Sequence, residues 1–166
     1  TLKRNTQNYY LIALRSFLKY LAKVDVKTLA PEKIELAKTS MRDLDLISRT
    51  EFQRLMISPS GGTMDDYRDR AILELLYSTG LRVSELCSLN TDLDLSADEF
   101  SIRGKGEKVR IVFLSQMAKD SIRRYLDERH KSKQKISSGA LFIAENGKRM
   151  YSRAVQRILK KRSIQA

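Results

Sequence analysis

Cysteine and histidine are almost missing from this sequence of 166 residues, which contains one of each. The single cysteine, Cys87, excludes an internal disulfide and a cysteine-based metal cluster, and the single histidine, His130, does not complete a metal site with it. Cys87 lies in an apolar helical pattern and is expected to be a small core residue. His130 stands in a charged run and is expected to be exposed. The sequence therefore predicts no metal site.

Long apolar runs are missing as well. No stretch reaches the roughly 18 apolar residues of a membrane-spanning helix, so we expect no membrane partner of that kind. The first residues, Thr1 to Thr6, are not followed by an apolar signal core, which argues against secretion. The sequence does not begin with Met, and we expect it to be part of a longer protein. Because only two residues are proline and 42% are hydrophobic, we expect a buried core rather than disorder.

Acidic residues are too few to balance the basic ones. Lys and Arg number 32 and Asp and Glu number 20, which gives a net charge of +12. Such an excess suits a polyanionic partner, with DNA or RNA ahead of an acidic membrane surface. Composition does not separate DNA from RNA, so a basic RNA- or ribosome-binding protein stays open as an alternative.

Hydrophobic periodicity predicts a mainly α-helical protein with a small antiparallel β-sheet, an α+β fold. From about residue 100 the apolar residues alternate with a period of two, which predicts a β-hairpin, with 92–95 as a candidate edge strand. The expected strands are 100–103 and 109–114. Helices are expected over 1–23, after Pro31, over 48–57, from Asp65 or Asp66 to Gly80, and over 83–89, 115–130 and 152–162.

Local signals also predict caps and core positions. Ser48 and Glu51 have the spacing of a capping box, and Ser152 is expected to cap the last helix. Three tyrosines lie in helical apolar patterns and are expected to be buried: Tyr10, Tyr77 and Tyr125. In the first helix, the apolar face is expected to contain Leu11, Leu14, Phe17, Leu18 and Leu21.

The segment 79–86 places an arginine at the start of a helix. Arg82 follows Gly80, which is expected to end the preceding helix. A cation at this position opposes the positive end of the helix dipole, and a bound phosphate would relieve that conflict. The simpler alternative, favoured when the segment is taken alone, is an ion pair between Arg82 and Glu85, three residues later on the same face.

The segment 103–110 places a lysine at a hairpin tip. Gly104 and Gly106 flank Lys105 and leave little bulk around its ammonium, which could donate a proton to a leaving oxygen. The alternative is an ordinary solvated lysine in a turn. The segment lacks the spacing of a Walker A loop, which argues against a nucleotide hydrolase.

The C-terminal region is strongly basic. From Lys148 to Arg162 there are seven basic residues and no acidic one. Four of them recur at helical steps and form a stripe: Arg153, Arg157, Lys160 and Lys161. A charged stripe is usually a solvated helix face, but one without acids favours contact with a phosphate backbone.

Taken in order, these motifs resemble those of the tyrosine recombinase (phage integrase) family, especially its Xer-like members. Residues 75–86 resemble the family's first active-site box, and Gly104-Lys105-Gly106 resembles its catalytic β-hairpin. Residues 48–56 resemble its short entry helix and 141–162 the stretch before its second box. The first helix, through Thr6, Tyr10, Ala13, Leu14, Arg15 and Phe17, resembles the last long helix of its core-binding domain.

The resemblance implies site-specific recombination through a 3′-phosphotyrosine intermediate, without a metal ion or other cofactor. Arg82 would bind the scissile phosphate, Lys105 would protonate the leaving 5′ oxygen, and Glu85 would orient Arg82. The implied partners are double-stranded DNA and other recombinase protomers, as a dimer or tetramer on DNA, in the cytoplasm at the nucleoid. The basic residues expected to contact DNA are Lys3, Arg4, Arg103, Lys108, Lys148, Arg149, Arg153, Arg157 and Lys160.

The sequence also departs from the family pattern. The second box, His-x-x-Arg, the later His or Trp and the nucleophilic tyrosine have no counterpart; Tyr151 precedes that box and His130 belongs to another helix. We therefore expect DNA binding without cleavage by this chain alone, with a non-catalytic DNA-binding module as a further alternative. The expected organisation is a partial core-binding domain over 1–38, a linker over 39–47 and a partial catalytic domain over 48–166.

Overall fold

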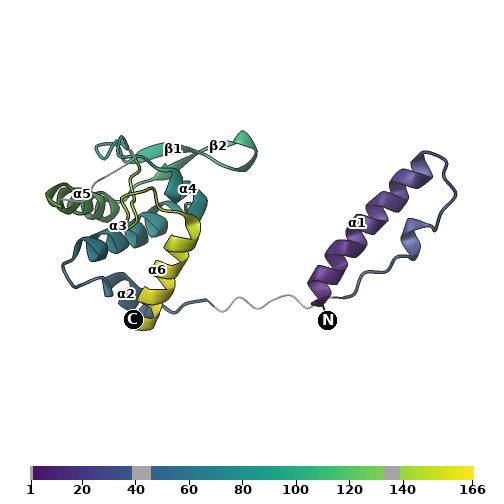
Figure 1. Ribbon diagram of the computed structural model, residues 1–166, viewed down its shortest axis with the longest axis horizontal. Helices are drawn as coiled ribbons and strands as arrows, with labels where there is room; N and C mark the ends of the chain where they lie inside the picture. The colour runs from purple at the N-terminus through teal and green to yellow at the C-terminus, as the bar shows by residue number, and fades with distance from the viewer. Residues whose placement is uncertain (1, 39–45, 133–138) are drawn as a thin grey trace. The chain divides into compact units, whose positions relative to one another are not determined.

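The computed structural model describes residues 2–38, 46–132 and 139–166, and for Lys105 the backbone alone (Figure 1). The chain divides into two compact units, Thr1–Leu46 and Ile47–Ala166. The linker predicted over 39–47 lies almost entirely outside the described residues. The assignment of 1–38 to a core-binding domain stays a prediction.

The first unit consists of one long helix and a returning segment. Helix α1 spans Arg4–Lys23, and a short 3-10 helix, η1, spans Pro31–Lys33 with proline at its start, as expected. The Asn8 side-chain amide donates to the carbonyl of Ala37 at 2.8 Å, and its oxygen accepts from the N–H of Ala37 at 2.9 Å. These two bonds fasten the returning segment to α1.

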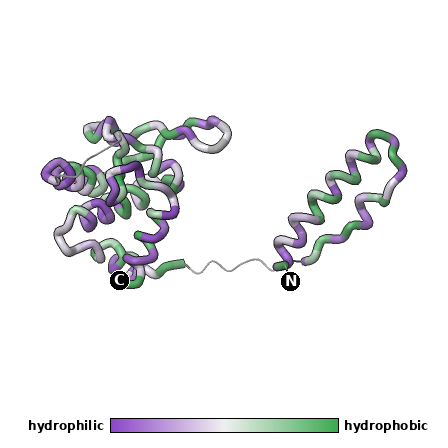
Figure 2. The backbone as a smooth tube through the Cα atoms, viewed as in Figure 1, coloured by the Kyte–Doolittle hydropathy of each residue, from purple (hydrophilic) through white to green (hydrophobic). Residues whose placement is uncertain are grey.

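Helix α1 buries little of its apolar surface in this unit. Figure 2 shows hydrophobic positions recurring along the helix, yet only Leu18 is buried. Leu14 and Phe17, expected on the buried face, are 42% and 56% exposed, and the prediction that Tyr10 is buried is wrong, because it is 59% exposed. The periodicity correctly predicts a helix, but within the described residues of this unit only the short returning segment packs against it.

The second unit is mainly helical and contains an antiparallel hairpin. Helices α3 (Met64–Thr79) and α5 (Gln116–Lys131) pack side by side, and α6 (Ser152–Gln165) and several connecting segments complete the core. Ile72, Leu75, Ile122, Tyr125 and Val155 are fully buried. Each such side chain contributes on the order of 1.5–3 kcal/mol by leaving water. The elements are α2 (Arg49–Ile57), α3 (Met64–Thr79), α4 (Val83–Ser88), β1 (Glu99–Arg103), η2 (Lys105–Glu107), β2 (Val109–Phe113), α5 (Gln116–Lys131) and α6 (Ser152–Gln165).

Helix boundaries are set by capping residues that are close in the sequence. The predicted capping box is confirmed: the N–H of Glu51 donates to the Ser48 hydroxyl at 3.2 Å, and the N–H of Ser48 donates to the Glu51 carboxylate at 2.8 Å. Helix α3 begins at Met64, earlier than predicted, because Thr63 and Asp66 form a second capping box. Gly80 ends α3 in the left-handed conformation, with φ 59°, as expected of a C-terminal glycine.

The predicted hairpin is confirmed, and the predicted edge strand is wrong. Strands β1 and β2 pair antiparallel, with Ile102 opposite Arg110. Residues 92–95 form no strand, because the Asp94 carboxylate accepts from the N–H and the hydroxyl of Ser96, at 2.8 and 2.6 Å, and folds the chain into a turn.

Of the remaining predictions for single residues, some are confirmed and others are wrong. Tyr125 is fully buried and stacks on Phe142 with ring centroids 5.6 Å apart. Tyr77 is 68% exposed, and its ring contacts that of Phe52 with centroids 4.6 Å apart. The prediction for Tyr77 failed because its helical position faces away from α5. Tyr151, rather than Ser152, occupies the cap position of α6 and makes no side-chain capping bond. His130 is exposed and Cys87 packs against the core, as expected.

Candidate functional site

Arg82 occupies the N-cap position immediately before α4, with an extended backbone, φ −66° and ψ 147°. The buried side chain of Leu81 anchors the chain just before it, and Gly80 supplies the turn out of α3. The Glu85 carboxylate accepts from the backbone N–H of Arg82 at 2.7 Å and so satisfies the first free donor of the helix. This local geometry directs the Arg82 side chain outward, where it is 61% exposed.

The carboxylate of Glu85 lies between two guanidinium groups. Arg82 Nη1 donates to Oε1 at 2.9 Å, while Arg110 donates from Nη1 to Oε1 at 2.9 Å and from Nη2 to Oε2 at 2.7 Å. The Glu85 side chain is only 7% exposed. Chiefly through the hydrogen bonds from Arg110, and against the opposing effect of burial, the pKa of Glu85 falls to about 2. We call Arg82, Glu85 and Arg110 the Glu85 cluster; at neutral pH it carries one net positive charge.

The sequence left two interpretations of Arg82: a phosphate-binding residue, or an arginine paired with Glu85. The ion pair of the simpler interpretation is present, at 2.9 Å. It engages Nη1 alone; among the contacts of the described residues, the other guanidinium N–H groups of Arg82 have no acceptor. Pairing with Glu85 and binding an anion are therefore compatible in this geometry.

The loop end of the hairpin lies against the Glu85 cluster. A methyl group added at Gly104 would lie 3.2 Å from Arg110 Nη1, 3.3 Å from Glu85 Oε1 and 3.4 Å from Arg82 Nη1. The main chain therefore approaches the cluster as closely as a glycine permits. Lys105 is the next residue, so the fold brings its backbone beside the cluster; the position of its ammonium lies outside the described part of the chain.

A shallow hollow of about 290 Å³ opens at this place. Arg82, Glu85, Arg103 and Gly104 line it, together with Ser84 and Ser88. Arg103 is 69% exposed and pairs with Glu107 at 3.0 Å, and Lys108 is exposed just before β2. Two of the predicted site residues, Arg82 and Glu85, thus share one hollow with a predicted DNA-contacting residue, Arg103.

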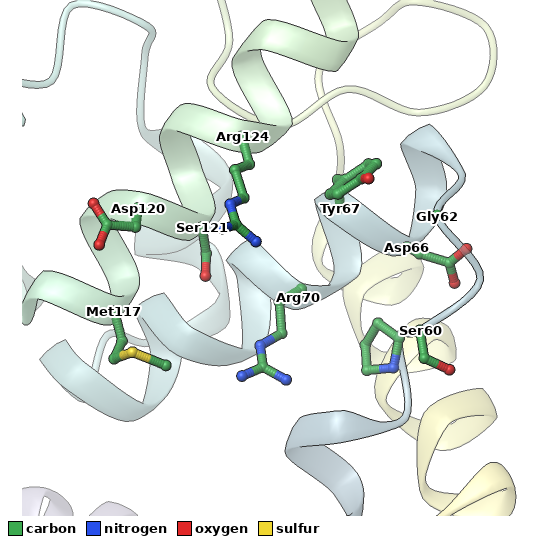
Figure 3. A pocket seen from close by; sticks show the side chains of 10 residues that line it. Ser60, Gly62, Asp66, Tyr67, Arg70, Met117, Asp120, Ser121 and Arg124 are labelled. Carbon is green, nitrogen blue, oxygen red and sulfur yellow. The ribbon is translucent and has the colours of Figure 1, made fainter.

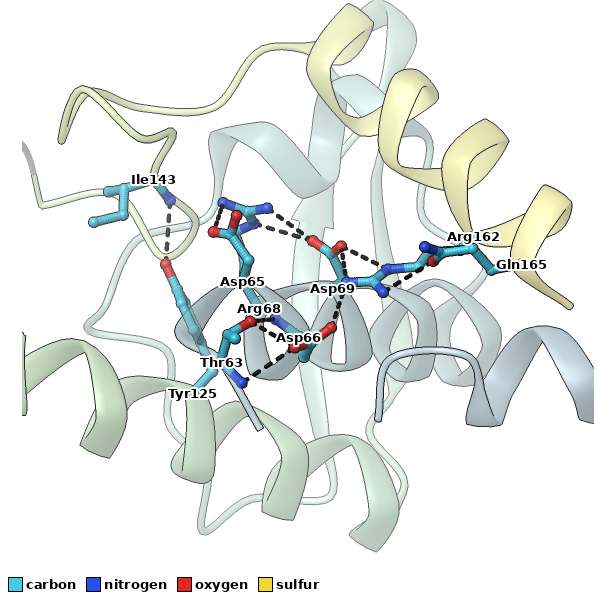
Figure 4. A network of polar contacts seen from close by, with 9 residues as sticks. All are labelled: Thr63, Asp65, Asp66, Arg68, Asp69, Tyr125, Ile143, Arg162 and Gln165. Carbon is cyan, nitrogen blue, oxygen red and sulfur yellow. Dashed lines mark hydrogen bonds and ion pairs between the residues drawn. The ribbon is translucent and has the colours of Figure 1, made fainter. Parts of the chain in front are cut away.

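The basic C-terminal region divides into an outer face and structural residues. Arg153, Arg157, Lys160 and Lys161 are exposed on α6, and Lys148 is exposed in the turn before it. Arg162 is different: it is 4% exposed and binds Asp66 and Asp69 of α3 at 2.8 and 2.7 Å (Figure 4). Residues 148–162 contain no acidic residue, and the acidic partners of Arg162, which lies outside the predicted stripe, come from α3 instead.

Arg149 also makes contacts that the sequence did not reveal. Its Nη1 donates to the carbonyls of Cys87 and Leu89, each at 2.9 Å, and its Nη2 donates to the Asn90 side chain at 2.5 Å. The side chain thereby ties the 144–150 segment to the end of α4. Its predicted contact with DNA stays a prediction, as do those of Lys3 and Arg4, which are exposed in the first unit.

Another hollow, of about 350 Å³, lies between α3 and α5 (Figure 3). Its charged lining is largely engaged with neighbours: Asp66 with Arg162, and Arg70 with Glu74 at 2.8 Å. Across the described ranges, no group of three or more His, Cys, Asp or Glu side chains gathers as a metal site. None of the helices described combines the length and the apolar character that crossing a membrane requires. The Glu85 cluster, which combines an exposed guanidinium with a hollow, is therefore the candidate functional site.

Comparison with known sequences gives consistent matches. The sequence model of the phage integrase family matches residues 46–166. The tyrosine recombinase XerC of Thermodesulfovibrio yellowstonii is 39% identical over 157 residues, which cover 91% of this chain and 52% of that protein. The tyrosine recombinase XerD of Oceanobacillus iheyensis is 36% identical over 165 residues, covering 97% of this chain and 55% of that protein. The chain thus spans about half the length of the curated relatives it matches.

Solved structures give the same grouping. The crystal structure of the XerA recombinase superposes with a TM-score of 0.64 at 26% identity, covering 99% of this chain and 55% of that one. The XerH recombinase bound to its palindromic difH substrate superposes with a TM-score of 0.68 at 23% identity, covering 98% and 49%. A λ integrase dimer bound to a core site gives 0.68 at 16% identity, covering 98% and 59%. The last two likenesses concern the fold alone.

Proposed function

The chain belongs to the phage integrase family, and from this premise we propose that it is part of a site-specific DNA recombinase and binds one DNA phosphate at the Glu85 cluster. One observation carries the proposal: Arg82 is fixed at the start of α4 by Glu85, yet its side chain is 61% exposed beside the hairpin that carries Lys105. Relatives named as tyrosine recombinases, and structural neighbours solved with DNA, support it.

The chemistry of the site follows from its charges. A phosphodiester attacked by a nucleophile gains charge on its nonbridging oxygens, and the outward N–H groups of Arg82 would stabilise that charge. A fixed donor of this kind is worth about 3–4 kcal/mol of transition-state stabilisation. Lys105 would protonate the leaving 5′ oxygen, and Glu85 would hold Arg82 in place. No step requires a metal ion or another cofactor.

The proposed partner is double-stranded DNA. Its backbone would run over the hollow beside Arg103 and Lys108 and over the outer face of α6. The exposed basic residues proposed to contact it are Lys3, Arg4, Arg103, Lys108, Lys148, Arg149, Arg153, Arg157 and Lys160. We further propose that residues 1–38 belong to a core-binding domain and 48–166 to a catalytic domain, and that two or four protomers assemble on DNA.

A charge-matched pair of variants tests the DNA surface. Replacing Arg153 and Arg157 by Gln should lower the salt dependence of binding to duplex DNA by roughly 0.9 in log–log slope for each lost phosphate contact. The control removes two charges from α5, as Arg123→Gln with Lys131→Gln, and should leave the slope unchanged. Fluorescence anisotropy at several salt concentrations measures both. Equal slopes for the two double variants, or equal affinity of the chain for structured RNA and duplex DNA, would favour a general nucleic-acid-binding protein.

Cleavage requires groups that have no counterpart in this sequence, so we propose that the chain binds DNA without cutting it. In a longer protein that supplies those groups, Arg82→Ala should abolish covalent attachment to a nicked suicide substrate and leave DNA affinity nearly intact. Gel analysis of the protein–DNA adduct measures this, with Arg123→Ala as the control. Normal adduct formation by Arg82→Ala would remove Arg82 from the mechanism, and persistent absence of any adduct would favour a non-catalytic DNA-binding module.

A further inference from the structure

Arg110 makes the most extensive contact in the Glu85 cluster. It comes from β2, opposite Ile102 of β1, and donates two parallel hydrogen bonds to the Glu85 carboxylate, at 2.9 and 2.7 Å. A two-point contact between a planar guanidinium and a carboxylate fixes the orientation of both groups, which a single hydrogen bond does not. Arg110 therefore determines how the Glu85 carboxylate is turned.

The acceptor positions of Glu85 are all occupied. Oε1 accepts from Arg82 Nη1 and Arg110 Nη1, and Oε2 accepts from the Arg82 backbone N–H and Arg110 Nη2. A carboxylate offers about four acceptor positions. Because Arg110 fills two of them and the backbone N–H of Arg82 fills a third, only one is left for the Arg82 side chain. Without Arg110, Glu85 would be free to turn toward Arg82 and pair with it fully.

The same contact connects the hairpin to α4. Arg110 belongs to the second strand. The Gly104 N–H donates to the Lys108 carbonyl at 2.9 Å, and this bond closes the loop that joins the two strands. A methyl group added at Gly104 would lie within 3.4 Å of all three members of the Glu85 cluster, so the main chain passes close to it. Holding Arg110 against Glu85 therefore also holds the segment that continues into Lys105 beside the helix that carries Arg82.

We propose that Arg110 is a positioning residue: by binding Glu85 at two points, it keeps the outward N–H groups of Arg82 available to a DNA phosphate and seats the Lys105 hairpin beside them. This inference rests on the proposed function, because it gives Arg110 a part in that site. It assigns Arg110 no contact with DNA.

Three variants of the chain separate positioning from charge. Arg110→Met removes both, Arg110→Lys keeps the charge but not the two-point contact, and Arg123→Met removes an exposed arginine paired with Asp120 on α5 as a matched control. The carbon-13 resonance of the Glu85 carboxyl group gives its pKa directly. We expect about 2 in the native chain and in Arg123→Met, a rise toward the ordinary 4.5 in Arg110→Met, and an intermediate value in Arg110→Lys.

Two further measurements report on the neighbours of Arg110. Amide hydrogen exchange at Gly104 and Val109 should become at least tenfold faster in Arg110→Met, with no change in the core helices α3 and α5. In the native chain, a short duplex DNA should shift the side-chain Nε–H resonance of Arg82. That shift should be lost in Arg110→Met and reduced in Arg110→Lys.

The outcomes are distinguishable. An unchanged pKa of Glu85 in Arg110→Met, or faster exchange spread evenly over the whole unit, would overturn the positioning role. If Arg110→Met does not fold, Arg110→Lys decides the question by the same measurements. If the native chain binds no duplex DNA, or binds it without a shift at Arg82, the proposed function fails, whatever the titration of Glu85 shows.

Discussion

Two groups of arginines and carboxylates in the second unit use the same chemistry with opposite results. In the Glu85 cluster, two guanidiniums share one carboxylate, and the Arg82 side chain is 61% exposed. In the second group, Arg68 and Arg162 face three carboxylates, and both arginine side chains are at most 7% exposed. Those carboxylates belong to Asp65, Asp66 and Asp69 (Figure 4).

The difference lies in charge balance and burial. An excess of guanidinium over carboxylate leaves N–H donors with no internal acceptor, and these must face water or an anionic ligand. An excess of carboxylate satisfies every buried guanidinium and can join two helices, here α3 and α6. Breaking a buried pair leaves an uncompensated charge away from water, whereas an exposed guanidinium can be rehydrated. The first group is suited to binding and the second to stability.

The largest effect should come from the buried group. Asp69→Ala removes the carboxylate that Arg68 and Arg162 share and leaves each with one acidic partner, Asp65 and Asp66. Because several buried hydrogen bonds to a charged group are lost, the free energy of unfolding should fall by about 3 kcal/mol. Urea denaturation followed by circular dichroism measures it. Asp120→Ala, which removes an exposed carboxylate from α5, should cost less than about 1 kcal/mol. If the two variants lose the same stability, the buried group does not hold α3 and α6 together.

A smaller and pH-dependent effect should come from Glu85. Its pKa is about 2 in the folded chain against 4.5 ordinarily, so its stabilising contribution is complete above the ordinary value and is lost as the pH falls toward 2. Between neutral pH and pH 3, the native chain should lose about 2 kcal/mol more stability than Glu85→Gln. Comparing the two chains cancels the titration of the other carboxylates. Parallel pH curves would mean that Glu85 is not held between two cations.

The smallest effect should come from Gly104, at the loop end of the hairpin. Gly104→Ala forces a methyl group against three hydrogen-bonded side-chain tips, and should cost about 1 kcal/mol by overpacking. Gly139→Ala is the control, because no atom lies within 4 Å of its added methyl group. Thermal unfolding of both variants measures the difference. Equal stability of the two variants would show that the loop end of the hairpin does not pack against the Glu85 cluster.

Short-range features were predictable from the sequence. The capping box of Ser48 and Glu51, the helix end at Gly80, and the pair of Arg82 with Glu85 each involve residues that are neighbours in the chain. Their geometry follows from backbone conformation and helical spacing alone. The hairpin was predictable for the same reason, since its two strands are joined by a short glycine-containing turn.

Long-range partners were not predictable from local patterns. Arg110 reaches Glu85 across 25 positions and Arg149 reaches Cys87 across 62, so these contacts exist only once the hairpin and the 144–150 segment have folded back. Arg162 resembled its surface neighbours because its acids lie on α3, up to 96 positions earlier. The exposure of Tyr77 has a local cause instead: two residues after buried Leu75, its side chain lies on the opposite side of α3.

The environment of Cys87 has a practical consequence. Its burial raises the pKa of the thiol, so little thiolate is present at neutral pH and maleimide or iodoacetamide reagents react with it slowly. A cysteine introduced on the exposed side of β1, for instance at Ser101, would react much faster. A fluorophore or spin label should therefore attach preferentially to such an introduced cysteine, while the half-buried Cys87 reacts more slowly.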